Sequence, residues 1–163
     1  DNGGADAGGW DAPTGGGSGG GGCFITTATV TAMGLADDCE ELTLARSLRD
    51  NNVDNTDSGK RKIKLYYSIA PSIVERFDGD WKEIYTKYIV PVTELVRQNR
   101  VEEADRIYTA MCIDLFDRYG LRYSDTEQVE LAAEIAGISK ETPYAVKYLL
   151  VRTALKFYKW FKG

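Results

Sequence analysis

The chain has 163 residues, of which 43% are hydrophobic and 28% are charged, and it carries a net charge of −5. These values are typical of a soluble protein with one core, and the acidic balance disfavours general nucleic-acid binding, which needs a basic surface. Histidine is absent, which excludes Ser-His-Asp and Cys-His catalytic arrangements and histidine-ligated zinc. The composition therefore favours a binding or structural protein over an enzyme, whose chemistry would have to use carboxylates, tyrosine, lysine or a thiolate.

Residues 1–22 are rich in glycine and poor in apolar side chains. Such a segment cannot bury enough apolar surface to offset the ordering of its backbone, which costs about 1–2 kcal/mol per residue. We expect a disordered, flexible linker that tethers the rest of the chain to an upstream domain or partner. Because the chain begins at Asp1 rather than Met, we also expect a fragment or a processed product.

Residues 23–34 start with a cysteine directly after the glycine run and continue with β-branched and small side chains. That composition allows a strand, but Phe24 and Thr27 recur at helical spacing and Gly34 supplies a C-terminal stop. We favour a short helix. It would place Cys23 at a helix N-terminus, where outward-pointing backbone N–H groups stabilise a thiolate.

A second helix is expected directly after the first. Asp37 and Glu40 have the spacing of a capping box, and this places Cys39 at the start of the helix. Arg46 and Arg49 fall near its C-terminal end. They are either solvent charges favoured by the helix dipole or a site for an anion or an acidic partner.

Four short motifs carry a resemblance to a known family: Cys23-Phe24-Ile25-Thr26-Thr27-Ala28, Asp38-Cys39-Glu40-Glu41-Leu42, Arg46-Ser47-Leu48-Arg49-Asp50 and Tyr66-Tyr67-Ser68-Ile69-Ala70-Pro71. Together they resemble the CFI-box domain of bacterial proteins, which opens with cysteine, an aromatic residue and isoleucine or leucine. The resemblance covers about residues 22–120 and implies a bacterial protein, but no activity. Thr29 stands where related sequences often have a further cysteine, and this chain continues to residue 163.

Three cysteines, Cys23, Cys39 and Cys112, are too few and too far apart for a disulfide framework or a CxxC site. Two alternatives stay open. One is a bridge between Cys23 and Cys39 in an exported protein, with Cys112 as a buried thiol. The other is three reduced thiols, of which two are simply packed. We expect no metal and no cofactor.

The middle of the chain predicts three amphipathic helices, over 63–77, 81–96 and 100–119. The polar, turn-rich residues 51–62 that precede them predict a loop. Pro71 and Pro91 fall inside the first two helices, and an internal proline costs about 3 kcal/mol. We therefore expect both helices to be bent or split there. Cys112 falls on the apolar face of the third helix, which ends at Gly120.

Two further helices are expected at the C-terminal end. Ser124 and Glu127 have capping-box spacing before a helix that ends at Gly137. The last helix covers residues 143–161. Its basic half on a helical wheel holds Lys147, Arg152, Lys156, Lys159 and Lys162, and its apolar half holds Val146, Leu149, Leu150, Ala154, Phe157, Trp160 and Phe161. This pattern is typical of an interfacial membrane helix or a partner-docking helix, or of a core helix whose solvent face is basic.

The sequence thus predicts an all-α fold: a disordered tail over 1–22, an irregular helical domain over 23–122 and a C-terminal helical hairpin or appendix over 123–163, with six or seven helices in total. We predict a helical protein-interaction or structural module of a bacterial protein, tethered by the linker, whose partner is another protein or the upstream domain.

Two other functions remain open. One is thiol-dependent activity or covalent modification at Cys23 or Cys39, and the other is a membrane-active effector or toxin domain acting through 143–161. The compartment also stays open, with secretion or a bacterial cell surface among the alternatives. The interaction candidates are Cys23, Phe24, Asp38, Cys39, Arg46, Arg49, Lys156, Lys159, Trp160 and Phe161.

Overall fold

The structure is a computed structural model that describes residues 23–53 and 56–162, with side chains except at 52, 53, 58 and 157–162. Within these ranges the chain forms seven continuous helical segments and no strand, which confirms the predicted all-α fold. The predicted linker over 1–22 lies outside the described residues.

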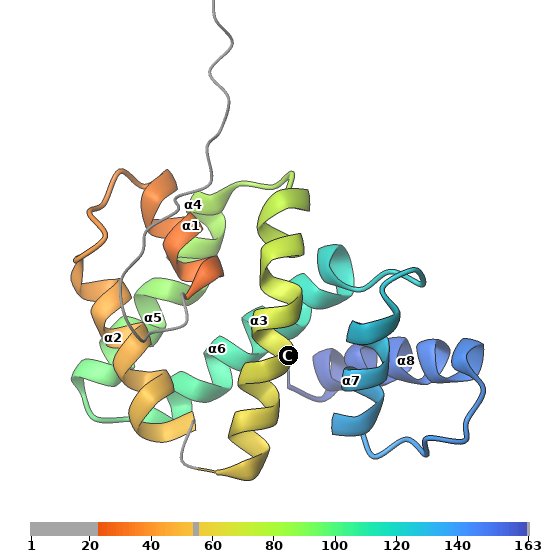
Figure 1. The fold of residues 1–163 in the computed structure, drawn as a ribbon. Helices are drawn as coiled ribbons and strands as arrows, with labels where there is room; N and C mark the ends of the chain where they lie inside the picture. The colour runs from red at the N-terminus through yellow and green to blue at the C-terminus, as the bar shows by residue number, and fades with distance from the viewer. Residues whose placement is uncertain (1–22, 54–55, 163) are drawn as a thin grey trace, which may run out of the picture.

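The helices follow the chain in the order that Figure 1 labels. The first three segments are α1 (Phe24–Ala32), α2 (Glu40–Leu48) with the π-helical turn η1 (Arg49–Val53), and α3 (Asp57–Arg76). The next two are α4 (Trp81–Ile84) with η2 (Tyr85–Ile89) and α5 (Val90–Arg97), and α6 (Val101–Leu115) with η3 (Phe116–Gly120). The last two are α7 (Thr126–Ile135) and α8 (Tyr144–Lys162).

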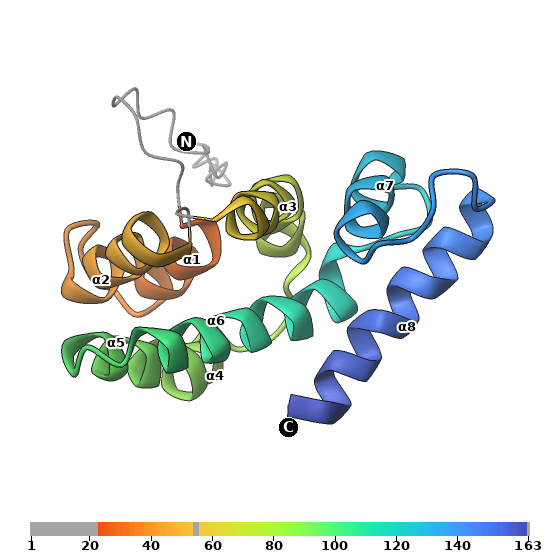
Figure 2. The same ribbon diagram turned by 90° about the horizontal axis from the view of Figure 1, so that it is seen from below.

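Seen from below, the helices lie in two layers (Figure 2). One layer holds α1, α2, α3 and α7, and the other holds α4, α5, α6 and α8. α1 packs against α2 and α3, and α3 packs against α7; across the layers, α2 packs on α5, α3 on η3, and α7 on α8. α3 and α6 therefore form the centre of the fold, with α1 and α2 at one end and α7 and α8 at the other.

The main hydrophobic core runs through both layers. It includes buried side chains from five helices: Ile25 of α1, Ile69 of α3, Met111 of α6, Val129 of α7 and Val151 of α8. Burying an aliphatic side chain of this size stabilises a fold by about 1.5–3 kcal/mol. The two C-terminal helices therefore share their core with the helices that precede them.

The two internal prolines have different consequences. We expected a bend or a split at Pro71; α3 continues through it as one 20-residue helix, so there is no split. Pro71 is exposed, and on an exposed face water can bond the carbonyl that has lost its N–H partner. Pro91 lies in the first turn of α5, directly after the π-helical turn η2. The regular α-helical pattern is therefore interrupted just before Pro91, as an internal proline favours.

The predicted loop over 51–62 is wrong, because helical structure continues to Val53 and resumes at Asp57. Thr56 is the residue that starts α3: its side chain accepts a hydrogen bond from the Gly59 N–H at 2.9 Å. A threonine followed by an acidic residue is a helix start signal that the polar composition of this stretch obscured.

Neither predicted capping box forms. α2 begins after Cys39 and α7 after Asp125, and neither side chain makes a capping hydrogen bond. Glu40 instead makes two hydrogen bonds, of 2.7 and 2.6 Å, with Arg97 of α5. A tertiary ion pair therefore replaces the local cap.

Gly120 ends η3 as predicted. Because it has no side chain, it also allows η3 to pack closely against α3. A Cβ at this position would lie 2.5 Å from Ile69 Cγ2 and 3.2 Å from Ile73 Cγ1, two core side chains of α3.

We expect Gly120→Ala to lower the free energy of unfolding by about 1–3 kcal/mol through overpacking, as measured by urea denaturation. Gly137→Ala is the control: its φ is +71° but a Cβ there meets nothing within 4 Å, so we expect a loss of only about 1 kcal/mol. An unchanged urea midpoint for Gly120→Ala would contradict the close packing.

Candidate functional site

Residues 25 and 26, at the start of α1, face the core and form hydrogen bonds with α3 and α6. The backbone N–H of Ile25 donates to Tyr66 Oη at 3.0 Å. Thr26 Oγ1 lies 3.1 Å from Tyr108 Oη, which in turn donates to Tyr66 Oη at 3.4 Å. Since Ile25 and Thr26 are fully buried, these hydrogen bonds fix α1 on the core rather than present it to a partner.

Cys23 is the N-cap residue of α1, as predicted, and its side chain is only 4% exposed. Arg49 Nη1 donates to Cys23 Sγ at 3.9 Å and to Tyr67 Oη at 2.8 Å, and Arg49 Nε donates to Asp50 Oδ1 at 2.5 Å. Burial raises the pKa of the Cys23 thiol, although the positive charges of Arg49 and Arg46 act in the opposite direction. The expected stabilisation of a thiolate at this helix end is therefore wrong: desolvation outweighs the nearby charges.

All three cysteines are free thiols. Cys39 is half-buried at the start of α2 and packs against the small apolar cluster of Cys23, Val30, Leu42 and Ala45. Cys112 is buried in α6, and burial raises its pKa well above the ordinary value. Of the two alternatives, the structure has the reduced thiols rather than a bridge. Over 23–53 and 56–162 no group of three or more acidic or cysteine side chains is placed to hold a metal ion.

The burial of two thiols predicts the order in which the cysteines react. In the folded protein we expect iodoacetamide to modify Cys39 at least about ten times faster than Cys23 or Cys112, because only Cys39 is partly accessible. Mass spectrometry of peptides after a short pulse measures the three rates, and the same pulse in urea is the control, in which the rates should converge. Faster modification of Cys23 than of Cys39 would contradict this arrangement.

The other predicted residues near the opening motif lie closer to solvent. Phe24 is partly exposed, and its ring meets the Tyr67 ring edge-on at a centroid distance of 6.1 Å. Arg46 pairs with Asp37 at 3.8 Å, and Asp38 is exposed. The structure thus brings Cys23, Cys39 and the two arginines together around the ends of α1 and α2. Here Arg49 and Arg46 form their polar contacts with neighbouring side chains of the same region.

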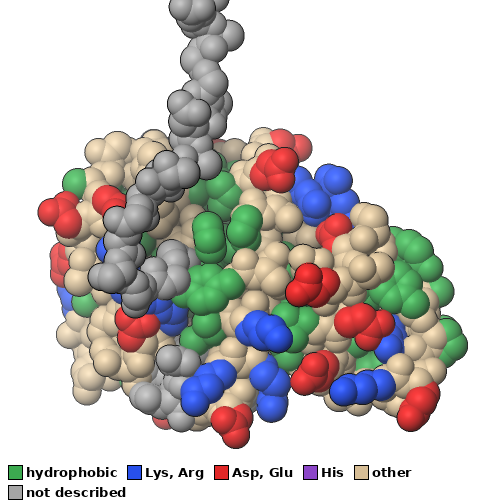
Figure 3. Space-filling view, viewed as in Figure 1, with side chains coloured by type: hydrophobic (Ala, Val, Ile, Leu, Met, Phe, Trp, Pro, Cys, Tyr) green, Lys and Arg blue, Asp and Glu red, His purple; other side chains and the backbone are tan. Residues whose placement is uncertain are grey.

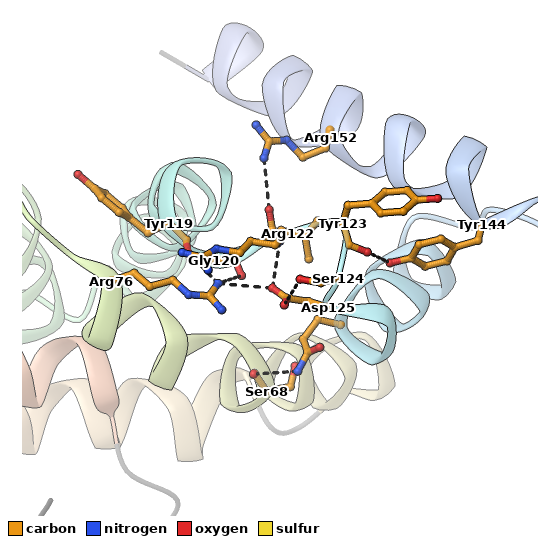
Figure 4. A network of polar contacts seen from close by, with 12 residues as sticks. Ser68, Arg76, Tyr119, Gly120, Arg122, Tyr123, Ser124, Asp125, Tyr144 and Arg152 are labelled. Atoms are coloured by element: carbon orange, nitrogen blue, oxygen red, sulfur yellow. Dashed lines mark hydrogen bonds and ion pairs between the residues drawn. The ribbon is translucent and has the colours of Figure 1, made fainter.

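Polar contacts fix α8 on the rest of the fold (Figure 4). Tyr144 Oη donates to the carbonyl of Tyr123 at 2.5 Å, and Arg152 Nη1 donates to the carbonyl of Leu121 at 3.4 Å. Arg152 also forms an ion pair with Asp117 of η3 at 3.2 Å. These contacts all lead to η3 or to the segment after it, so they restrain α8 from rotating about its own axis.

The segment that receives α8 is itself tied to α3 (Figure 4). Arg76 Nη1 lies 3.4 Å from three oxygens: the carbonyls of Tyr119 and Gly120 and Oδ2 of Asp125. Asp125 Oδ2 also accepts from the backbone N–H of Arg122 at 3.0 Å. One half-buried guanidinium therefore joins α3, η3 and the start of α7.

Lys147 decides which side of α8 faces inward. Its side chain is 7% exposed, and Nζ donates to Glu130 Oε2 of α7 at 2.7 Å. Tyr144, Tyr148, Val151 and Leu155 also face the core. The helical wheel placed Lys147 on the basic half of the helix, away from the packed side, and this is wrong. Lys147 lies on the side of α8 that packs on the core, among these aromatic and aliphatic side chains.

The opposite side of α8 consequently exposes apolar side chains. Val146 is 43% exposed, Leu149 is 63% exposed and Leu150 is 44% exposed. We call these three residues the α8 outer face. Leu149 and Leu150 lie three and four residues after Val146, which places all three on one side of the helix. Hydrophobic side chains also gather at the end of the molecule where α8 begins (Figure 3). Of the predicted candidates in this helix, Lys156 is exposed, and the side chains of Lys159, Trp160 and Phe161 lie outside the described part.

In the parts of the chain that the structure describes, no helix is both long enough and apolar enough to cross a membrane. Comparison with models of protein families gave no match, and searches of curated proteins and of solved structures gave no significant match. The resemblance to the CFI-box family therefore stays a prediction based on its four motifs.

Proposed function

We propose that this chain is a helical protein-interaction module that binds another protein through the α8 outer face. The observation that carries the proposal is the exposure of Val146, Leu149 and Leu150 on a helix whose opposite side is fixed by buried and paired side chains. Exposed apolar residues at this spacing are how an amphipathic helix packs on a partner helix or in a groove. Under the proposal the linker over 1–22 tethers the module to an upstream domain of a bacterial protein of the CFI-box type.

A protein partner suits the α8 outer face better than a membrane surface does. An interfacial membrane helix needs basic side chains on its polar side to meet anionic lipid headgroups. Two of the basic residues of α8 are already engaged inside the fold, because Lys147 pairs with Glu130 and Arg152 pairs with Asp117. The helix therefore has fewer cationic groups to offer a bilayer than its sequence suggests.

Thiol chemistry is supported less well. A reactive cysteine needs an accessible thiol with a lowered pKa. Cys23 and Cys112 are buried and their pKa values are raised. Cys39 is the only one of the three that is partly accessible.

The experiment places a photoreactive benzophenone side chain at position 149 of the full-length protein in the cells that produce it. We expect one crosslinked protein adduct of defined mass. The same group at position 145, an exposed position on the flank of α8, is the matched control and should give little adduct. Leu150→Glu should abolish the adduct formed from position 149, because a carboxylate on the surface opposes apolar docking.

Two results would contradict the proposal. One is an adduct of equal yield from positions 145 and 149 that Leu150→Glu leaves unchanged, since that would mean nonspecific contact. The other is an adduct with lipid alone, which would support the membrane alternative. An adduct of twice the mass of the chain would identify the protein partner as a second copy.

A further inference from the structure

A cavity of about 340 Å³ lies between α2, α3, α6, α7 and α8, on the inward side of α8. Its walls are mainly apolar and include Leu48, Leu65, Ile113, Ala132, Val151 and Leu155. This volume falls within the range of small-molecule sites, which are mostly apolar with a few polar groups that orient the ligand. The cavity is distinct from the α8 outer face, because its α8 residues lie on the inner side and the flank of that helix.

The polar groups of the lining include tyrosine hydroxyls, thiols, the hydroxyl of Thr109 and charged groups. The hydroxyls of Tyr66 and Tyr108 are engaged with α1, and the thiols of Cys23 and Cys112 are held in the neutral form by burial. The charged groups at the wall are Arg49, Lys62 and Asp105. Two of these three residues are cationic, and one of the two, Arg49, forms an ion pair with Asp50, which does not line the cavity.

Lys62 is the cation best placed to meet a ligand. It is exposed on α3 at the rim of the cavity, whereas Arg49 already bonds Asp50, Tyr67 and Cys23. A local cation beside apolar walls attracts a ligand that has an apolar body and an anionic end. The arrangement does not favour a neutral apolar ligand, which would gain nothing from Lys62.

We propose that the cavity binds a single-chain amphiphile, with its alkyl chain between α3, α6 and α8 and its anionic headgroup beside Lys62 and Arg49. A fatty-acid carboxylate and a lipid phosphate share this chemistry. The site is separate from the α8 outer face, so this inference does not depend on the proposed protein partner.

The test is isothermal titration of the full chain, below the micelle concentration, with three ligands of equal chain length: dodecanoate, dodecyl phosphate and dodecanol. We expect saturable 1:1 binding of at least one of the two anions and binding of dodecanol that is weaker by about fivefold, since one exposed charge pair contributes about 1 kcal/mol at most. Preference for dodecanoate would indicate a free fatty acid as the source, and preference for dodecyl phosphate a lipid phosphate. Equal affinity for dodecanol, or no saturable binding of either anion, would overturn the proposal.

Two pairs of variants locate the ligand. Ala154→Trp puts an indole at the wall of the cavity and should abolish binding, while Ala145→Trp, at another exposed alanine of α8 that does not line the cavity, should not.

Lys62→Gln should weaken the affinity for the two anions about fivefold without changing the affinity for dodecanol. Lys64→Gln, at an exposed lysine of the same helix away from the cavity, is its control. Unchanged binding in both Ala154→Trp and Lys62→Gln would place the ligand elsewhere and contradict the assignment.

Leu150→Glu separates this inference from the proposed function. We expect it to abolish crosslinking from position 149 to the protein partner and to leave binding of dodecanoate or dodecyl phosphate within about twofold of the unmodified chain, because Leu150 does not line the cavity. Loss of ligand binding in this variant would mean that the two sites are one surface.

Discussion

Raising the pH from 9 to about 12 is expected to unfold the protein cooperatively. Burial raises the pKa of Cys112 above its ordinary value of 9.0, and that of Tyr66 and Tyr108 above 10.0. These groups stay protonated in the folded chain and lose their protons in the unfolded one. Their contribution to stability is therefore complete below the unfolded-state pKa values and is lost as the pH rises above them.

The expected slope is steep because the three groups add. Each contributes about 1.4 kcal/mol per pH unit, so the free energy of unfolding should fall by about 4 kcal/mol per unit above pH 10. Small proteins have about 5–15 kcal/mol of stability in total. The measurement is a series of urea denaturation curves at pH 8 to 11.

Single hydroxyl deletions test which groups cause the slope. Tyr108→Phe should reduce it by about 1.4 kcal/mol per pH unit. Tyr123→Phe, which removes the hydroxyl of an exposed tyrosine, is the control. A free energy of unfolding that is constant from pH 9 to 11 would contradict the burial of these groups.

Ile25→Ala is expected to lower the free energy of unfolding by about 2–5 kcal/mol, through lost burial and a cavity in the core. Ile25 is fully buried in the main core, and its backbone N–H holds Tyr66 Oη at 3.0 Å. The measurement is urea denaturation followed by circular dichroism. Leu35→Ala, at a partly exposed leucine just after α1, should cost less than about 1 kcal/mol. Equal costs at the two positions would mean that α1 is not part of the core.

The positions of most helices could be predicted from the sequence because their apolar residues repeat at helical spacing over many residues. Gly34 and Gly137 have a φ of +71° and end α1 and α7, as a glycine stop predicts. The capping patterns at Asp37 and Ser124 failed for a different reason. A capping box is a weak local preference. At the first of the two patterns, Glu40 makes a bidentate ion pair with Arg97 of another helix instead.

The direction in which α8 faces could not be predicted from its own sequence. The helix has two apolar stripes, one with Val146, Leu149 and Leu150 and one with Tyr144, Tyr148, Val151 and Leu155, so periodicity alone does not choose between them. The choice depends on residues in other elements. Glu130 of α7 pairs with Lys147, and Asp117 of η3 pairs with Arg152.

The cavity was also beyond the reach of sequence analysis. Its wall is assembled from five helices, and the residues that line it run from Cys23 to Leu155. Most of these residues, taken alone, look like ordinary core or surface positions, and Cys23 and Arg49 were singled out for other reasons. Lys62 illustrates this: in the sequence it belongs to a polar stretch taken for a loop, and only the assembly of the helices around the cavity places it beside an apolar wall.

The central claim is that α8 buries Lys147 and turns Leu149 and Leu150 to the outside. Pulsed acetylation of lysines in the dilute, folded protein tests it most directly, with each site read by mass spectrometry. We expect Lys147 to be acetylated at least about tenfold more slowly than Lys156, which lies on the same helix and is exposed. Acetylation of Lys147 as fast as that of Lys156 would mean that α8 is rotated, with its leucines on the core, and would contradict the proposed interaction surface.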